Sequence, residues 1–201
     1  MGGSRILGDI TQPNVESRFL NLAVAVEALI DAGVHPDEKI LRGTLLTKIV
    51  SSGKFRAYAE GDVASGGNFS NAADTFTLED QDALLKMKHF RVGDVIEGVD
   101  GTALGEIATF NPTTGVGTLT GNSANNYVSP NAVRIAESVA TLANQDGRIL
   151  KSEVVVTAGQ DEPVAAYTEG FFTKPRVIGA TVASILALGA TEPTTDELRL
   201  R

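Results

Sequence analysis

Residues 43–59 alternate between two sets of side chains on either side of a short loop. Alternate positions share one face of each arm: Leu45, Thr47 and Ile49 before the loop, and Phe55, Ala57 and Ala59 after it. A period of two places successive side chains on opposite faces of a strand. The loop is Ser51-Ser52-Gly53, and its glycine can adopt the positive φ that a tight turn needs. The pattern predicts a β-hairpin that contains no chemically reactive residue.

The segment Phe19–Asp31 fits two periods. As a helix it is apolar almost all round, and Gly33 could end it. As a strand it places four aliphatic residues on one face: Val24, Val26, Ala28 and Ile30. Its alanines and leucines favour helix, so propensity alone predicts a helix here.

Residues 90–135 hold several short alternating runs separated by close turns. The turns are predicted at 99–102 and 111–115, where an Asp-Gly and an Asn-Pro pair occur. Three or four strands this short, the last at Val133–Ile135, are typical of a small β-barrel similar to an SH3 domain. The preceding segment, Glu60–Thr75, has the composition of a loop.

The remaining patterns predict further strands and two short helical segments. Strands are expected at 138–144, 149–157 and 163–172. Helical segments are expected at Thr77–Lys88, capped by its first residue, and at Thr194–Arg201. Together these patterns predict a mainly β fold, a mixed β structure with few short helices.

Composition narrows the possible partners. The chain of 201 residues carries a formal net charge of −8 and no cysteine. An acidic protein lacks the basic surface through which proteins bind nucleic acids and anionic membranes. The absence of cysteine excludes disulfides and thiolate metal sites. No signal-peptide pattern is visible, and the longest apolar stretches, 22–30 and 177–190, are too short or too interrupted to span a bilayer. We therefore expect a soluble intracellular product that binds no nucleic acid and no membrane.

Histidine is rare in this chain. His35 lies beside Pro36 in a predicted turn, and His89 lies beside Lys88. We identify neither a second histidine nor a carboxylate at the spacing by which a helix presents two metal ligands. We therefore expect exposed histidines in turns and no metal site.

Acidic residues cluster at Glu79–Asp82 and at Asp161–Glu162. Neither cluster has the alternating oxygen ligands and central glycine of a calcium loop, so solvated faces are expected. The glycines of 115–121 lack the spacing of a phosphate-binding loop, and no G-x-S-x-G motif is present. The sequence therefore favours a protein that is not an enzyme and has no cofactor. Paired carboxylates need only be close in space, so a hydrolase stays open as an alternative, with these candidates: Asp80, Asp82, Asp161 and Glu162.

Residues 1–18 mix glycine, proline and polar residues with isolated aliphatic residues. Such a segment is either a frayed terminus or an arm that becomes ordered only against a partner. In the second case Ile6, Leu7 and Ile10 would anchor the arm.

Residues 41–55 have the sequence LRGTLLTKIVSSGKF, and residues 163–172 have the sequence PVAAYTEGFF. The first stretch resembles the pattern R/P-G-T-x-L-x-K-x-x-x-S-G-K-Y/F of tailed-phage head decoration proteins of the lambda D type. The second is similar to that family's late strand, in which an aliphatic run ends in a glycine and leads towards a C-terminal helix. The two stretches occur in the order that the family has.

The resemblance implies a decoration-type β domain that forms a homotrimer at local threefold positions of an expanded phage capsid and cements its coat subunits. It also implies an extended strand for 19–31 and an N-terminal arm that becomes ordered on the shell. The partner would be the major capsid protein. The protein would then be located on the virion exterior after synthesis in the host cytoplasm. The residues expected to contact the capsid are Ile6, Leu7, Ile10 and Phe19.

The stretch 90–135 has no counterpart in the family pattern, so it is expected to be an insertion. The expected organisation is a flexible arm at 1–18, a decoration-type domain at 19–85 plus 138–201, and an inserted small β module at 86–137. A second hypothesis makes the inserted module a surface display or host-binding module. The carboxylate-based hydrolase is the third.

Overall fold

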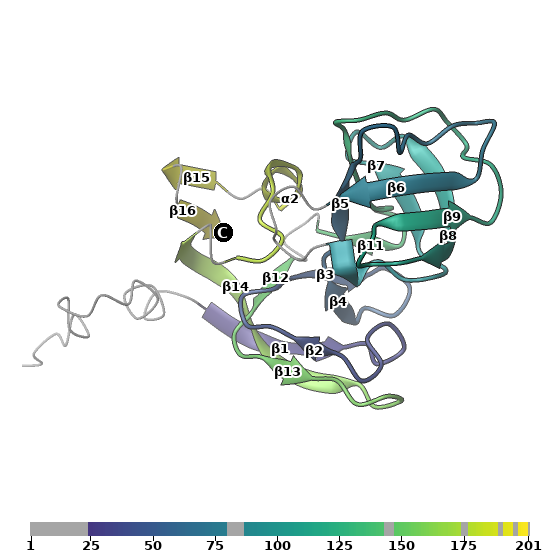
Figure 1. Ribbon diagram of the computed structural model, residues 1–201. Coiled ribbons are helices and arrows are strands. Elements are labelled where there is room, and N and C mark those ends of the chain that lie inside the picture. The colour runs from purple at the N-terminus through teal and green to yellow at the C-terminus, as the bar shows by residue number, and fades with distance from the viewer. Residues whose placement is uncertain are drawn as a thin grey trace, which may run out of the picture.

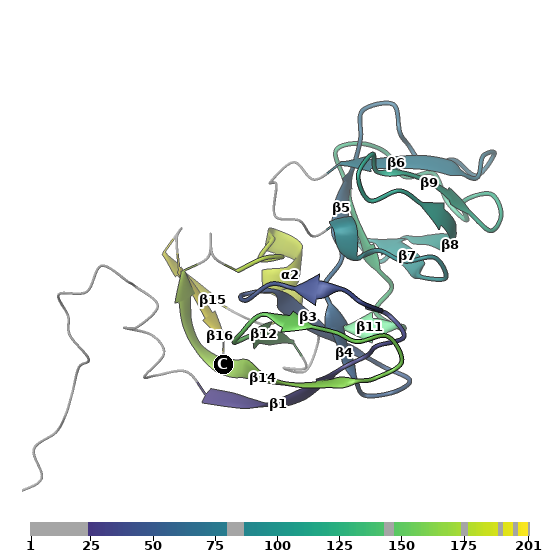
Figure 2. The ribbon, with the colours of Figure 1, turned by 60° about the horizontal axis from the view of Figure 1, so that its bottom comes forward.

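The computed structural model describes residues 24–79, 87–142, 147–173, 177–188, 191–194 and 197–200. These residues are mainly β, which confirms the fold class expected from the sequence. They form two parts that lie side by side, a body and a smaller closed barrel (Figures 1 and 2). Within the described ranges, no helix has the length and apolar character needed to cross a membrane.

Strands make up both parts, and the helical elements among the described residues are short. The body strands are β1 (Val24–Ile30), β2 (Lys39–Ile40), β3 (Leu45–Ile49), β4 (Phe55–Ala57), β11 (Ala140–Thr141), β12 (Arg148–Leu150), β13 (Val154–Val155), β14 (Glu162–Thr173), β15 (Thr191–Thr194) and β16 (Glu197–Leu200). The barrel strands are β5 (Glu60–Val63), β6 (Thr75–Glu79), β7 (Val95–Gly98), β8 (Ala103–Phe110), β9 (Val116–Leu119) and β10 (Ala132–Ile135). The helical elements are the 3-10 turn η1 (Met87–His89) and the helix α2 (Val182–Ala187).

The body sheet runs in the order β1-β4-β3-β12-β14-β16-β15, and β1 also pairs with β14. The first five strands of this order therefore form an incompletely closed ring, which is open along most of β1. Strand β1 pairs antiparallel with β14 along its whole length, whereas its pairing with β4 joins Ile30 to Phe55. Strands β3 and β4 form the predicted hairpin, and Gly53 takes a φ of 72° in its turn.

The body sheet is buried on both faces, because consecutive residues of its central strands enter two different cores. On β3, Leu45 lies in one core and Leu46 in the other; Ile149 and Leu150 divide in the same way on β12. All three residues of β4 are buried as well. Full burial of one leucine side chain contributes about 1.5–3 kcal/mol. The β3–β4 hairpin is therefore central to the stability of the body.

The barrel closes in the order β10-β5-β6-β9-β8-β7 and has a hydrophobic core of its own. Phe69 and Phe76 stack in this core with ring centroids 4.7 Å apart. The turns at 99–102 and 111–115 join neighbouring strands as predicted, and Val133–Ile135 lies in the last strand, β10. The small closed barrel expected from the sequence is thus present.

The barrel begins earlier than the expected boundary at residue 86. Strands β5 and β6 precede that boundary, and Tyr58 and Ala59 alone separate β4 from β5. The glycines of Glu60–Thr75 suggest a loop, but the segment supplies strand β5 and the buried ring of Phe69. The predicted boundary between the domain at 19–85 and the inserted module at 86–137 is therefore wrong, since the barrel strands occupy 60–135.

The helix predicted at Thr77–Lys88 is wrong at its start. Thr75–Glu79 forms β6, which pairs with β5 and β9. Phe76 and Leu78 alternate into the barrel core, so pairing and burial outweigh the cap-like sequence at Thr77. Residues 80–86 lie outside the described part, and η1 follows them.

The two ends of the body also differ from the propensity-based predictions. Residues 24–30 are strand β1, as the family resemblance implies, and 19–23 lie outside the described ranges. Where Thr194–Arg201 predicts a helical turn, β15 and β16 pair antiparallel. Strand β16 also pairs with β14, and its Leu198 is fully buried in the body. The predicted C-terminal helical turn is therefore wrong, because alternation lets Leu198 fill the core.

Candidate functional site

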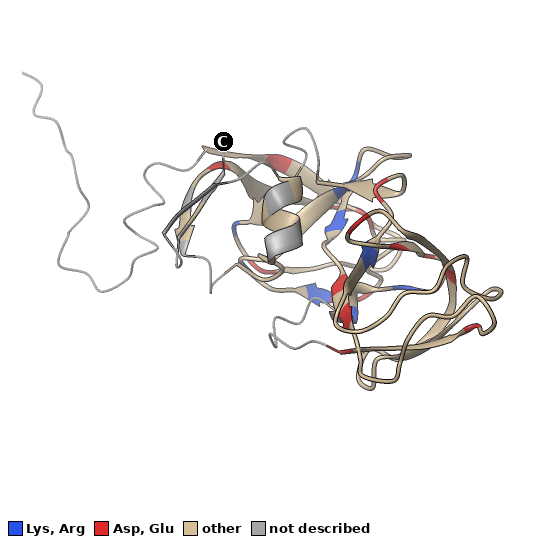
Figure 3. Cartoon of the chain, turned by 90° about the horizontal axis from the view of Figure 1, so that it is seen from above, with Lys and Arg blue, Asp and Glu red and all other residues tan. Residues whose placement is uncertain are grey.

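A buried polar cluster joins the body to the barrel. Its members come from the loop after β1, from strand β4, and from η1 and the residues that follow it. We call it the junction cluster, and its side chains are His35, Glu38, Arg56, His89, Arg91 and Asp94. Backbone segments coloured for basic residues and for acidic residues lie close together where the body and the barrel meet (Figure 3).

Arg56 and Asp94 form a buried ion pair across the junction. Arg56 is 2% exposed, and its guanidinium donates to both carboxylate oxygens of Asp94, over 2.5 and 2.9 Å. It also donates to the carbonyl oxygen of His89 over 3.0 Å. The backbone N–H of Arg91 donates to Asp94 over 2.7 Å. These charge-assisted bonds tie β4 of the body to the segment after η1.

Glu38 is held as a carboxylate by three neighbours. The Nδ1 of His35 lies 2.6 Å from its Oε2, and the Arg91 guanidinium donates to the same oxygen. The Nδ1 of His89 lies 3.4 Å from its Oε1, an electrostatic contact longer than an ordinary hydrogen bond. Burial by itself would raise the pKa of Glu38. The three neighbours outweigh burial and hold the pKa of this carboxyl well below its ordinary value.

His35 is fully buried, and its hydrogen bonds define its tautomer. The backbone N–H of Ala57 donates to its Nε2 over 3.0 Å, so Nε2 carries the lone pair. The proton of the neutral ring therefore resides on Nδ1, which donates to Glu38. Burial lowers the pKa of His35 below its usual value, although Glu38 acts in the opposite direction.

His89 is 1% exposed and lies edge-on to His35, with ring centroids 5.8 Å apart. Neither of its ring nitrogens has a hydrogen-bond partner among the described residues. Burial lowers the pKa of His89 to about 4, against the opposing effect of Glu38. At neutral pH His89 is therefore an uncharged imidazole enclosed between the body and the barrel.

Both histidines contradict the prediction that they lie exposed in turns. The loop from Asp31 to Glu38 folds over β4, where the N–H of Ala57 needs an acceptor and His35 provides it. The sequence carries one signal of this arrangement that the prediction missed: the carboxylate of Glu38 stands three residues after His35. The approach of His89, Arg91 and Asp94 from the barrel has no local signal.

The junction cluster could in principle be a metal site, because ligand atoms of His35, Glu38 and His89 lie within 4.8 Å of one another. The geometry opposes this. His35 accepts at Nε2 and therefore carries a proton on Nδ1, the nitrogen that faces Glu38. The Arg91 guanidinium already binds Glu38. Glu38 and His89 remain as ligands, which is fewer than the three or four protein ligands that zinc sites use.

Zinc is accordingly expected to leave the thermal midpoint of the protein unchanged. A site occupied at about 100 times its dissociation constant would stabilise the fold by about 2.7 kcal/mol, which thermal unfolding detects easily. The measurement is a melting curve with and without zinc, with His89→Leu as the comparison. A zinc-dependent rise in the midpoint that His89→Leu abolishes would show that His89 is a ligand.

A second polar contact links α2 to the connection between β4 and β5. The Tyr58 hydroxyl donates to Glu60 Oε2 over 2.6 Å, and the Thr181 hydroxyl donates to the same oxygen over 2.7 Å. Glu60 is buried. Burial, and next the negative charge of Glu60, raises the pKa of Tyr58 well above its usual value. These bonds fix the direction in which the chain leaves the body and enters the barrel.

Tyr58→Phe is expected to lower the free energy of unfolding by about 2 kcal/mol, because it removes a hydrogen bond to a buried carboxylate. Tyr127→Phe is a matched control, since the Tyr127 hydroxyl donates to a neutral carbonyl, that of Ala132. Its effect is expected to be about 1 kcal/mol. Urea unfolding measures the free energy of unfolding of both variants. A larger loss in Tyr127→Phe than in Tyr58→Phe would contradict this prediction.

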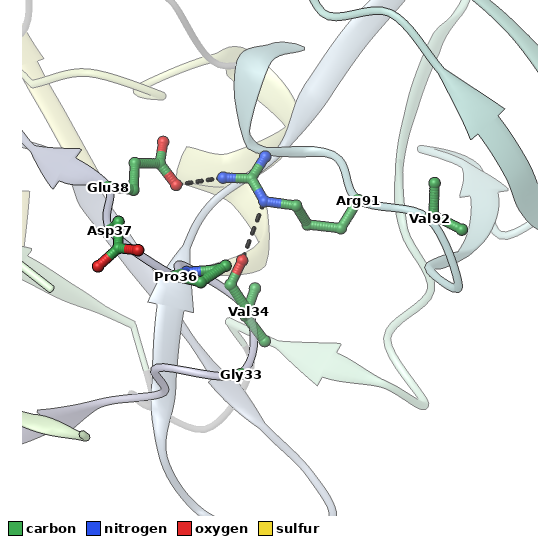
Figure 4. A pocket seen from close by; sticks show the side chains of 7 residues that line it. All are labelled: Gly33, Val34, Pro36, Asp37, Glu38, Arg91 and Val92. Carbon is green, nitrogen blue, oxygen red and sulfur yellow. Dashed lines mark hydrogen bonds and ion pairs between the residues drawn. The ribbon is translucent and has the colours of Figure 1, made fainter. Parts of the chain in front are cut away.

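An open pocket of about 600 Å³ lies beside the junction cluster (Figure 4). It is lined by Gly33, Val34, Pro36, Asp37, Glu38, Arg91 and Val92. Glu38 and Arg91 belong both to the pocket lining and to the junction cluster, and Arg91 Nε donates to the Val34 carbonyl over 2.9 Å. Asp37 is a non-glycine residue with a φ of 53°, and its Oδ1 accepts from the N–H of Ala158 over 3.0 Å.

The site residues predicted from the sequence do not include any member of the junction cluster. The expected capsid contacts are outside the described residues: Ile6, Leu7, Ile10 and Phe19. Asp80 and Asp82 are outside them as well.

Asp161 and Glu162 lie at the end of β14 that pairs with Ile30. Asp161 accepts from the N–H of Ala32 over 3.1 Å and binds the Lys54 ammonium over 2.7 Å. The Lys54 hydrogen bond is the main cause of the lowered pKa of Asp161. Asp161 therefore braces the loop after β1 against β14, and its oxygens are engaged in that contact.

Among the glycines of 115–121, Gly115 lies in the turn between β8 and β9 and Gly117 lies in β9. Comparisons of this chain with known protein families, with curated proteins and with solved structures found no match.

Proposed function

We propose that this chain is a structural virion protein that decorates the outside of an expanded phage capsid. In this proposal it binds the major capsid protein as a homotrimer at local threefold positions and performs no catalysis. The observation that carries the proposal is an exposed aliphatic edge at β1. The sequence resemblance of 41–55 and 163–172 to lambda D-type decoration proteins supplies the identity of the partner.

The β1 edge is suited to contact with another chain. Val24, Val26 and Leu29 are 47%, 38% and 39% exposed. One side of β1 pairs with β14; on the other side, within the described residues, Ile30 pairs with Phe55 and nothing pairs with 24–29. An open, aliphatic strand edge favours pairing with a partner strand. This strand directly follows the N-terminal residues that are expected to reach the coat.

The hairpin that carries the family pattern supports a scaffold role. Strand β4 is buried throughout, and Leu45 and Leu46 enter opposite cores. Its side chains are therefore engaged within the subunit, which leaves binding to β1 and the arm before it.

The physical basis of cementing is binding to one state of the shell. A ligand that binds the expanded shell alone stabilises that shell by mass action. A trimer that bridges three coat subunits adds buried area across the joints that internal pressure would open. Three linked contacts also act at a high effective concentration, so each can be weak. Closure of a trimer requires a head-to-tail interface, to which an open strand edge is suited.

The proposal is tested by sedimenting the purified protein with expanded and unexpanded capsids and by measuring its oligomeric state. We expect a trimer that sediments with expanded capsids alone. Deletion of residues 1–18 and the double change Val26→Lys with Leu29→Lys should each weaken sedimentation. Val155→Lys is the matched control, because Val155 is exposed on β13, outside the β1 edge. A strict monomer with no affinity for capsids contradicts the proposal.

One observation favours a second function, display or host binding by the barrel. The barrel has its own core and stands beside the body (Figure 2). Its first and last strands are neighbours, with Glu60 paired to Arg134, so a short linker can replace the segment between them. Arg56→Met must accompany this deletion, because the deletion removes Asp94. Capsid sedimentation and host adsorption, measured separately on this variant, assign the barrel to one role or the other.

A further inference from the structure

We propose that the open pocket beside the junction cluster receives a lysine side chain of a partner protein. The pocket lies between the loop that follows β1 and the residues that follow η1 (Figure 4). This inference concerns the chemistry of the occupant, and it rests on the proposed function only for the identity of the partner as the coat protein.

The walls of the pocket match an aliphatic stem. Val34, Pro36 and Val92 supply apolar surface, and Val92 is 67% exposed with no role in the barrel core. Lysine carries four methylene groups that pack along apolar surface while its ammonium stays near water. The pocket therefore covers the stem of such a side chain and leaves its charged end at the rim.

The charges that line the pocket favour a cation. Asp37 and Glu38 are acidic, and Arg91 is the basic residue among the lining residues. Arg91 directs its donors inward, to Glu38 and to the carbonyls of Val34 and Lys88. The pair of Arg91 and Glu38 is thus compensated, and Asp37 adds a negative charge that no cation within the described ranges pairs with.

Asp37 is positioned before any ligand arrives. Its backbone lies in the left-handed region at φ 53°, which aspartate tolerates better than most residues. The N–H of Ala158 engages its Oδ1 over 3.0 Å, which leaves Oδ2 for a ligand. A single oxygen suits the point charge of an ammonium, whereas a guanidinium binds best to two parallel oxygens. Lysine is therefore favoured over arginine.

The openness of the pocket argues for a side chain on a partner protein. Small-molecule sites enclose most of their ligand. This pocket is open to solvent on one side, so a side chain anchored in a larger interface fits it better than a free amine. The net charge of −8 on the whole chain adds a long-range attraction for a basic partner surface.

The test is an NMR titration of the full chain with N-acetyl-lysine methylamide, followed through backbone amide signals. Signals of Gly33, Val34, Asp37, Glu38 and Val92 should shift, with an affinity on the order of millimolar. N-acetyl-norleucine methylamide, which keeps the stem and lacks the charge, should bind about fivefold more weakly. Shifts of equal size with both probes, or no shifts at the pocket, overturn the proposal.

Two variants separate the pocket from general electrostatics. Asp37→Asn keeps the left-handed backbone and an acceptor for Ala158, and it should weaken lysine binding by about fivefold. Asp100→Asn changes the charge equally in an exposed barrel turn, where Asp100 likewise accepts a backbone N–H, and it should have no effect. Equal effects of the two variants overturn the proposal. Because the titration uses no capsid, its failure leaves the result of the sedimentation experiment unaffected.

Discussion

Replacing Asp94 with alanine is expected to lower the free energy of unfolding by about 3–5 kcal/mol. Asp94 neutralises Arg56, a residue that is 2% exposed and whose guanidinium donates to both oxygens of the carboxylate. Removing the carboxylate leaves a charged guanidinium enclosed between the body and the barrel. An uncompensated buried charge is far more costly than a lost surface contact. The loss should therefore be a large part of the total stability of a domain of this size.

Urea unfolding, followed by far-ultraviolet circular dichroism, measures this loss. Glu153→Ala is the matched control, because it breaks an exposed ion pair with Lys39 and should change the stability by less than about 1 kcal/mol. The double variant Arg56→Met with Asp94→Leu removes both charges and should regain most of the stability. A loss in Asp94→Ala no larger than that in Glu153→Ala would contradict this view of the junction. A double variant as unstable as Asp94→Ala would assign the loss to packing instead.

The elements that the sequence predicted correctly are those fixed by neighbouring residues. The β3–β4 hairpin follows from alternation around Gly53, and the turns of the barrel follow from Asp-Gly and Asn-Pro pairs. Strand β1 needed the family resemblance, since its alanines and leucines favour helix. Its backbone is extended because β14 pairs with every residue from Val24 to Ile30. Long-range pairing of this kind has no trace in local propensity.

The missed elements share one cause, which is that distant residues decide their structure. Thr77 resembles a helix cap, yet Phe76 and Leu78 are required in the barrel core. Leu198 fills the body core from β16, which pairs with β14 across more than twenty residues of chain. Glycines gave Glu60–Thr75 the composition of a loop, although close strands in a small barrel also use glycine.

The candidate site was the least predictable part of the protein. Arg56, His89 and Asp94 meet because the chain enters the barrel directly after β4 and returns past the same strand after η1. Nothing in the alternation of β4 indicates that Arg56 points to a buried carboxylate. The spacing of His35 and Glu38 was the one local signal, and it concerns a hydrogen bond rather than a metal.

The junction has a consequence for how the barrel is held. Asp94 of the barrel binds Arg56 of β4, and Arg91 donates to the Val34 carbonyl and to Glu38, so these bonds join the barrel to the body. The connection through Tyr58 and Glu60 adds a further fixed point near α2. A barrel held at these separate points keeps its orientation on the body. Under the proposed function, this would present the barrel in one direction from the capsid surface.

Lowering the pH from 6.5 to about 4.5 is expected to destabilise the protein by roughly 3 kcal/mol, chiefly through His89. Burial lowers the pKa of His89 to about 4 from 6.5. Between these two pH values the imidazole of His89 binds a proton in the unfolded chain but not in the folded protein. The contribution of neutral His89 to the free energy of unfolding is therefore present above pH 6.5 and is lost as the pH decreases. Each pH unit corresponds to about 1.4 kcal/mol. The pKa of His35 is also lowered, which adds to the loss in the same window.

The pH window separates the histidines from the carboxylates. The pKa of Glu38 is lowered in the folded protein, so ionised Glu38 stabilises the fold above its ordinary pKa of 4.5 and this contribution is lost below that pH. Glu38 therefore adds little to the change of stability with pH above 4.5. His89→Leu should reduce the slope between pH 6.5 and 4.5 while changing the stability at pH 7 by less than about 1.5 kcal/mol, since the ring nitrogens have no hydrogen bond to lose. NMR titration of His89 gives its pKa independently. A His89 pKa near 6.5, or an unchanged slope in His89→Leu, would show that this histidine is open to water and that the junction is looser than its hydrogen bonds indicate.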